Sequence, residues 1–288
     1  MGDATQTILA GIAVGLATGL VAAGAALVAR ATRTLHLAVG SIVVTGLLVH
    51  LTLSAPPINA PLVVALGVGC LVAALLSAAL EPLVLTPLRT AVGRLLGLAA
   101  AGAIVAALTG RVLGARTIRP APLVTVDGFE VAGVTVDPAV VAALVIGLPG
   151  ALLLASASER TRWGRQIRLV GSSPAAAARI GISPGWVRAG ALAVSGVVGV
   201  IAMAAAAPIT FAGLPQAAGL TLAAAAIVVL AEDRPSRAVG VGIVLGVIEA
   251  LGQSAWPAAG GEVVTGLVVL AALVVRGGEH MRSWGRAW

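Results

Sequence analysis

Residues 158–188 read S-E-R-T-R-W-G-R-Q-I-R-L-V-G-S-S-P-A-A-A-A-R-I-G-I-S-P-G-W-V-R and lie between two apolar stretches. Six arginines fall in this interval, in a chain that is 59% hydrophobic and has 18 basic residues. A segment with this density of charge cannot lie in the hydrocarbon core of a bilayer, so it must be a loop between membrane spans. Its excess of arginine predicts that the loop is cytoplasmic, because the cytoplasmic loops of membrane proteins carry most of the positive charge.

The composition of the whole chain is that of an integral membrane protein, with a mean hydropathy of +1.07 and only 10% charged residues. A net charge of +7 and a pI near 11.6 do not indicate nucleic-acid binding, because the arginines are distributed between apolar stretches and are not pooled on one surface. The single cysteine, Cys70, excludes an intramolecular disulfide and a cysteine-based metal cluster.

Windows of about 20 apolar residues predict where the chain crosses the membrane. The expected segments are Thr7–Ala29, Leu35–Leu53, Pro61–Leu80, Ala91–Thr109, Ala139–Ala157, Ala189–Ala207, Ala217–Ala231, Ala238–Leu251 and Val263–Val275. The last three are short and are expected to tilt, pair or re-enter. We therefore expect one all-α polytopic domain over residues 1–288, with eight to nine transmembrane or re-entrant helices.

Alternation of the spans from the cytoplasmic loop 158–188 puts fifteen arginines inside and three outside. This predicts a multi-pass protein of the plasma (inner) membrane with its N-terminus outside and its C-terminus in the cytoplasm. The largest outer segment is 111–137, where V-T-V-D-G-F-E-V alternates around Asp127 and Gly128 and predicts a small β-hairpin. Such a hairpin either contacts a soluble partner or only joins two helices.

A short helix is expected inside the cytoplasmic loop. Ser173 provides an N-cap, Pro174 occupies the first helical position, and Gly181 is a natural C-terminal stop. Two turns of helix are too short to be stable alone, so this helix must pack on the protein or on a partner. Ser183 and Pro184 begin the next helix in the same way.

Residues 162–170, just before the short helix that begins at Pro174, predict an amphipathic helix at the membrane interface. One face would carry Trp163, Ile167 and Val170, and the other Arg162, Arg165 and Arg168. The arginines would then face phosphate headgroups or a protein partner.

These segments resemble the permease subunits of branched-chain amino-acid ABC importers. The family's Thr-Arg-x-Gly-Arg-x-x-Arg pattern is matched by Thr161, Arg162, Gly164, Arg165 and Arg168, and its cytoplasmic loop by Pro174, Ala176, Ala177, Gly181 and Ile182. The segment E-P-L-V-L-T-P-L-R at 81–89 is similar to the family's Glu-(apolar)-Pro-Leu-Arg segment. The segment L-H-L-A-V-G at 35–40 resembles the family's Asn-Phe-Ala-His-Gly motif only at Ala38 and Gly40.

The resemblance implies that the cytoplasmic loop docks on an ATP-binding subunit. The residues that would form this ATPase-coupling helix are Pro174, Ala176, Ala177, Arg179, Gly181 and Ile182. It also implies a second permease subunit, an extracytoplasmic solute-binding protein, and a path for an amino acid or similar small polar solute. ATP would be bound by the partner, since the chain has no G-x-x-x-x-G-K-[ST] motif and no lysine to complete one. An ordinary loop helix is the alternative interpretation of this segment.

Three residues are candidates for the substrate path: His36, Gly40 and Glu249. His36 and Val39 stand where the family motif has Asn and His, so the substrate preference cannot be inherited from it. Glu249 lies in an apolar segment and is expected either to contact substrate or to bond a neighbour near the outer end of its helix. A stand-alone secondary transporter that uses Glu249 as its coupling carboxylate is the alternative function.

Two further expectations concern catalysis and helix packing. No catalytic or metal-binding pattern such as H-E-x-x-H or G-x-S-x-G is present in the sequence, so we expect no enzyme activity from this chain. Gly11, Gly15 and Gly19 form a doubled G-x-x-x-G, a pattern that lets helix backbones approach closely, as do Gly242 and Gly246. With 37 glycines in the chain, chance matches to this pattern are expected.

Overall fold

Helices dominate the part of the chain that the computed structural model describes, namely residues 2–114, 117–118, 120, 129–131, 134–255, 263, 266–267, 270–271 and 274. The helices are α1 (Gly2–Thr32), α2 (Val39–Ser54), α3 (Leu62–Leu80), α4 (Ala91–Val112), α5 (Pro138–Arg160), α6 (Arg162–Ser172), α7 (Pro174–Arg179), α8 (Pro184–Ala206), α9 (Pro215–Leu230) and α10 (Pro235–Ala255). A single π-helical turn, η1 (Glu81–Leu85), continues α3. The predicted all-helical membrane class is confirmed.

Six helices among the described residues are long and apolar enough to cross a membrane, so the expected count of eight to nine is not supported. They lie at Ala4–Thr32, Leu62–Leu85, Ala91–Val112, Pro138–Arg160, Pro184–Ala206 and Pro235–Ala255. The apolar helices α2 and α9 have 16 residues each, fewer than the roughly 20 that a crossing needs. The expected segment Val263–Val275 lies mostly outside the described residues.

The short length of α2 follows from where it begins. Residue Arg33 has a φ of 56° and ends α1, and the chain runs without helical structure up to Ala38. Ala38 packs closely against Gly102: if Gly102 carried a Cβ atom, that atom would lie only 3.0 Å from the Ala38 Cα. Because Gly102 is in the middle of α4, the expected crossing at Leu35–Leu53 starts inside the bundle and is helical over only part of its length.

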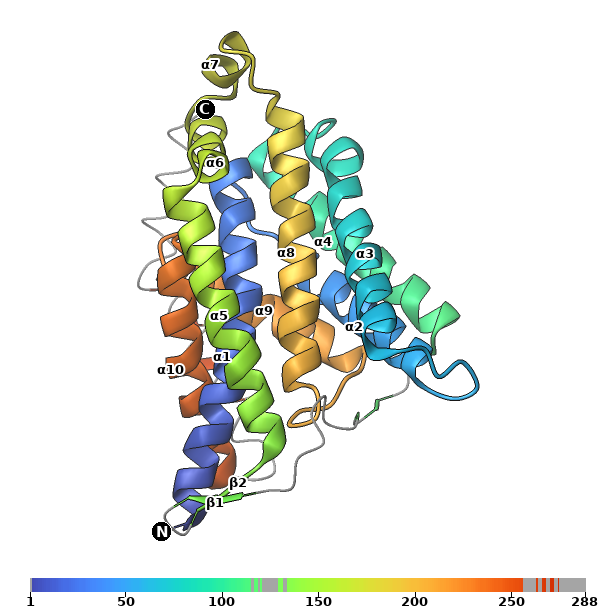
Figure 1. Ribbon diagram of the computed structural model, residues 1–288. Helices are drawn as coiled ribbons and strands as arrows, with labels where there is room; N and C mark the ends of the chain where they lie inside the picture. The colour runs from blue at the N-terminus through green and yellow to red at the C-terminus, as the bar shows by residue number, and fades with distance from the viewer. Residues whose placement is uncertain are drawn as a thin grey trace.

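Helix α1 forms the centre of the bundle and packs against α5, α8, α9 and α10 (Figure 1). Its residues from Leu16 to Val28 are almost all buried. Close contacts surround it, since an added Cβ on Gly24 would lie 2.9 Å from the Ser195 Cα of α8. On another side, a Cβ on Gly147 of α5 would lie 2.6 Å from a Leu16 methyl group.

Glycines bring the backbones of α1 and α10 into direct contact. An added Cβ on Gly15 would lie 2.5 Å from the Gly242 carbonyl oxygen, and one on Gly11 would lie 2.9 Å from the Gly246 carbonyl oxygen. A Cβ on Gly19 would lie 3.0 Å from the carbonyl oxygen of Val239. The repeats on the two helices therefore face each other and are not chance matches, as expected where small residues permit helix association in lipid.

Two short strands, β1 (Phe129–Val131) and β2 (Val134–Val136), pair antiparallel with Phe129 opposite Val136. They lie near the N-terminal end of α1, at the end of the bundle away from α7 (Figure 1). The predicted hairpin turn at Asp127 and Gly128 lies outside the described residues, and the residues that pair are 129–131 and 134–136. The predicted position of the hairpin is therefore not supported.

We predict that Gly15→Leu destabilises the bundle by about 3 kcal/mol or more, because the side chain would overlap the backbone of α10. Thermal unfolding in detergent, followed by fluorescence-detected size exclusion, measures the effect. Gly67→Leu is the matched control, since no atom lies within 4 Å of a Cβ added on this glycine of α3. Equal unfolding temperatures for the two variants would contradict the role of the α1–α10 contact.

Candidate functional site: the end of the bundle that carries α7

Helix α6 begins at the cap that its sequence predicts, and its two faces divide as expected. The Thr161 hydroxyl accepts a hydrogen bond from the Gly164 amide at 3.2 Å. Ile167 and Val170 are buried, while Arg162 and Arg165 are exposed. The apolar face of α6 is therefore turned into the protein.

Two glycines set α6 tightly against the ends of α1 and α5. An added Cβ on Gly164 would overlap the carbonyl oxygen of Ser158, and one on Gly171 would overlap that of Arg30. Arg33 Nε donates to the Gly171 carbonyl at 2.9 Å, and Arg168 Nη1 donates to the Ser158 carbonyl at 2.7 Å. These contacts hold α6 in a fixed position on the helices that end beside it.

Helix α7 has the N-terminal cap that its sequence predicts. The Ser173 hydroxyl accepts a hydrogen bond from the Ala176 amide at 3.2 Å, and Pro174 occupies the first helical position. The helix has only six residues, so the cap supplies a large share of its local stability.

The C-terminal end of α7 is a Schellman motif. The Gly181 amide donates to the Ala178 carbonyl at 3.1 Å, and the Ile182 amide donates to the Ala177 carbonyl at 3.0 Å. Gly181 has a φ of 81°, a conformation that favours glycine. The predicted stop at Gly181 is confirmed, and the chain turns back there towards α8.

The helix α7 projects beyond the ends of α6 and α8 (Figure 1). Ala177 is fully buried, whereas Ala178 and Arg179 are exposed. Ile180 is 67% exposed and Trp186, in the first turn of α8, is 82% exposed. The outer surface of this segment therefore combines one arginine with large apolar side chains.

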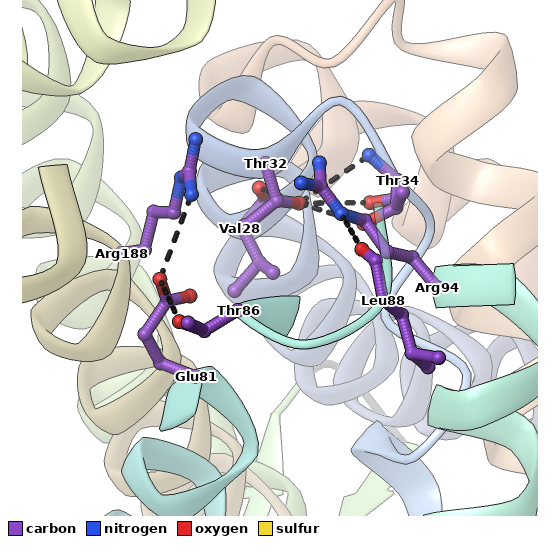
Figure 2. Close-up of polar contacts among 8 residues, drawn as sticks. All are labelled: Val28, Thr32, Thr34, Glu81, Thr86, Leu88, Arg94 and Arg188. Carbon is purple, nitrogen blue, oxygen red and sulfur yellow. Dashed lines mark hydrogen bonds and ion pairs between the residues drawn. The ribbon is translucent and has the colours of Figure 1, made fainter. Parts of the chain in front are cut away.

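An ion pair joins the end of α3 to the beginning of α8. Arg188 Nη1 lies 3.5 Å from Glu81 Oε1, and the Thr86 hydroxyl donates to the same oxygen at 3.5 Å (Figure 2). The two charged side chains are 12% and 6% exposed, so the pair is shielded from solvent. It spans the boundary between the helix that follows α7 and the helix that carries η1.

Polar contacts also organise the chain segments beside this pair (Figure 2). Arg94 Nε donates to the Leu88 carbonyl at 2.7 Å and holds the connection between η1 and α4. The Thr32 hydroxyl donates to the Val28 carbonyl at 2.8 Å and lies 2.9 Å from the Thr34 hydroxyl, where α1 ends. Three separate sets of polar contacts therefore lie near one another at this end of the bundle (Figure 2).

Comparison with known proteins assigns the chain to a family. A family model described as "Branched-chain amino acid transport system / permease component" matches residues 7–273. The chain belongs to this family. It is thus a multi-pass membrane permease component, and the family that its sequence resembles is confirmed. A search of curated proteins finds no match.

Among solved structures, the permease is similar to a chain of PsaBC from Streptococcus pneumoniae in complex with Fab. The TM-score is 0.55, and the match covers 94% of this chain and 91% of that chain. The sequence identity is 13%, so this likeness concerns the fold alone.

The predicted substrate-path residues His36 and Gly40 lie together near the start of α2. His36 is 4% exposed, and neither of its ring nitrogens has a hydrogen-bond partner within the described residues. The Gly40 amide donates to Thr221 Oγ1 of α9 at 3.1 Å, and an added Cβ on Gly40 would overlap the Ala217 carbonyl oxygen. The segment is thus tightly packed against α9 in this conformation of the permease.

Glu249 lies on α10, a different helix from the one at whose start His36 and Gly40 lie. It is half-buried on α10 and adjoins Ala250, whose Cβ lies 2.9 Å from the position of a Cβ added on Gly11. This contact places Glu249 near the N-terminal end of α1, away from α7. No group of three or more His, Cys, Asp or Glu side chains that could hold a metal ion occurs among the described residues.

Sequence reasoning missed three features of the α7 end. It placed Ala177 among the docking residues, but this side chain faces inward. It did not identify Ile180 or Trp186 as exposed, and it treated Glu81 only as part of a family segment. The pairing of Glu81 with Arg188 has no local signal, because the residues are far apart in the sequence and meet only when α3 and α8 pack together.

We predict that Ser173→Ala loosens α7 by about 1 kcal/mol, because the cap of a six-residue helix is lost. Hydrogen exchange of the α7 amides should accelerate roughly fivefold. Ser172→Ala is the matched control, since the Ser172 hydroxyl only donates to the Leu169 carbonyl at the end of α6. Exchange rates in α7 that match those of the control would show that the cap does not hold the helix.

Proposed function

We propose that the permease is the transmembrane subunit of an ABC importer and forms part of the path for an amino acid or similar small polar solute. Separate ATPase subunits would drive it, and α7 would be the helix on which they act. The projecting, doubly capped α7, held between α6 and α8, is the observation that supports this proposal. The family description, which names a permease component of an amino-acid transport system, agrees with it.

The geometry of α7 suits the transfer of a displacement. Its exposed side, with Ala178, Arg179 and Ile180, is available to a soluble partner, whereas Ala177 faces inward. A helix this short gains stability when a partner packs against it. Its two neighbours are anchored, α6 by the Gly164 and Gly171 contacts and α8 by its packing against α1 and α3. Movement of α7 would therefore be passed on to long helices.

The remaining parts of the proposal concern partners and chemistry. A second permease subunit, identical or related, would complete the path, and an extracytoplasmic solute-binding protein would deliver the cargo. The exposed arginines of α6 would face lipid headgroups or the ATPase subunit. The permease itself would catalyse no reaction and would bind no cofactor, since ATP would be bound by the partner.

The orientation of the permease is also proposed, from the distribution of charge. The described arginines near the α7 end are Arg30, Arg33, Arg89, Arg94, Arg160, Arg162, Arg165, Arg168, Arg179, Arg188, Arg234 and Arg237. Arg111 lies at the opposite end of α4. An excess of arginine marks the cytoplasmic side, so we place α7 in the cytoplasm and the N-terminus outside. A crossing by the expected segment Val263–Val275 would then put the C-terminus in the cytoplasm.

A photo-crosslinking amino acid at position 178 tests the proposed function. We expect it to capture an ATP-binding subunit in membranes of cells that make the whole transporter, because the Ala178 side chain is exposed on α7. Mass spectrometry of the cross-linked product identifies the partner. The same amino acid at the exposed Ile58 is the control. This residue belongs to the segment that joins α2 to α3, which lies at the end of the bundle away from α7 (Figure 1).

The alternative, a stand-alone secondary transporter, predicts a different outcome. Position 178 would then link to no ATP-binding subunit, and Glu249→Gln would abolish transport while Gly181→Ala would change it little. An importer driven through α7 should instead be sensitive to Gly181→Ala, since a φ of 81° is strained for alanine.

Single-cysteine labelling tests the orientation. In a Cys70→Ala background, a cysteine at the exposed position Ser172 should react with a membrane-impermeant maleimide only from the cytoplasmic side. A cysteine at the exposed position Asn59 should react only from outside. The reverse pattern would overturn the proposed topology.

A further inference from the structure

Burying the charged side chains of Glu81 and Arg188 away from solvent costs free energy. Both side chains are nearly removed from solvent, where the end of α3 meets the beginning of α8. Charged groups in such surroundings are disfavoured unless they are paired, and an apolar pair of similar size is often at least as stable. Stability alone therefore does not account for a glutamate and an arginine at these positions.

The pair occupies the point where movement of α7 would enter the bundle. Arg188 lies one turn into α8, and only residues 180–183 separate α8 from the end of α7. Glu81 is the first residue of the π-helical turn η1, which joins α3 to the connection before α4. A force on α7 that rotates the first turn of α8 would thus act directly on the end of α3 through this pair.

The hydrogen-bonding capacity of the pair is only partly used. Arg188 Nη1 and Glu81 Oε1 are 3.5 Å apart, while Arg188 Nε and Glu81 Oε2 are buried and have no partner within the described residues. Arginine and carboxylate groups commonly form two parallel hydrogen bonds. A rotation of the first turn of α8 towards α3 that presents the Nε–Nη2 edge of Arg188 to Glu81 would give both unpartnered atoms a partner in two parallel hydrogen bonds, so a second, discrete arrangement is open to the pair.

Close backbone contacts farther along α3 and α8 from the ion pair allow the two helices to move together. An added Cβ on Gly196 of α8 would lie 2.7 Å from the Ala73 carbonyl oxygen of α3. One on Gly46 of α2 would lie 2.7 Å from the Gly69 carbonyl oxygen of α3. Because α3 is in close contact with both α8 and α2, a displacement of α8 can reach α2 through α3. His36 lies just before α2, and Gly40 lies in its first turn.

We propose that Glu81 and Arg188 are positioning residues that transmit displacement of α7 to α3, through a change from a single ion-pair contact to two parallel hydrogen bonds. The inference rests on the proposed function, in which an ATPase subunit acts on α7. Neither residue touches the solute. The pair sets where α8 stands relative to α3, and it does so through the geometry of the guanidinium group and not through charge alone.

Arg188→Lys separates geometry from charge, because lysine keeps the ion pair but cannot form two parallel hydrogen bonds with one carboxylate. The experiment uses the permease with its ATPase subunit in lipid nanodiscs, in a Cys70→Ala background. Spin labels at Leu71 of α3 and Val145 of α5, both exposed, report the distance between these helices by double electron–electron resonance. ATP with vanadate traps the closed ATPase.

We expect a shift of the Leu71–Val145 distance on trapping in the parent protein and its loss in Arg188→Lys. The exchanged variant Glu81→Arg/Arg188→Glu should restore the shift, because it rebuilds the same paired groups. Arg237→Lys is the matched control and should keep the full shift, since Arg237 pairs with Glu232 at an exposed site.

A full shift in Arg188→Lys, or no recovery in the exchanged variant, would overturn the inference. Retention of the ATPase subunit by Arg188→Lys, together with an unchanged unfolding temperature, shows that the variant is folded and docked. If that variant unfolds, the exchanged variant alone decides the question. A parent protein that binds no ATPase subunit would instead contradict the proposed function, so the two failures are distinguishable.

Discussion

Contact between helix backbones through glycine is the constraint on which the rest of this bundle depends. Lipid is as apolar as leucine, so helices in a membrane gain little from burying apolar side chains and associate through close packing instead. Gly15 and Gly242 bring α1 against α10, Gly24 meets α8, and Gly147 of α5 receives Leu16. Because α1 is packed on several sides, it fixes the positions of the helix ends against which α6 packs and to which α7 is joined.

Close backbone contact through glycine also fixes the position of α6 at the α7 end of the bundle. Gly164 and Gly171 fit α6 against the last turns of α5 and α1, so the arginines of α6 are presented outward from a fixed support. The helix α7 is joined to this support on one side and to α8 on the other. In the proposed mechanism, the fixed base, the short projecting helix and the ion pair between α3 and α8 would together connect the surface mechanically to the interior.

The candidate site could be predicted from the sequence where the signals are local. The Ser173 cap, the Gly181 stop and the division of α6 into apolar and arginine faces depend on residues within a few positions of each other, and all three are found in the structure. The number of crossings could not be predicted in the same way. Apolar composition at 35–53 predicted a full span, yet the chain before Ala38 is drawn against Gly102 and is not helical.

The sequence by itself determined the membrane class, the caps of the short helices and the family, because hydropathy, capping chemistry and motif spacing are properties of neighbouring residues. Only the tertiary structure decided which glycine repeats are used, that Ala177 faces inward, and that Glu81 meets Arg188. These depend on which helices are adjacent and at what depth. Many glycine-rich apolar helices offer equivalent faces, so their pairing is settled by the packing of the whole bundle.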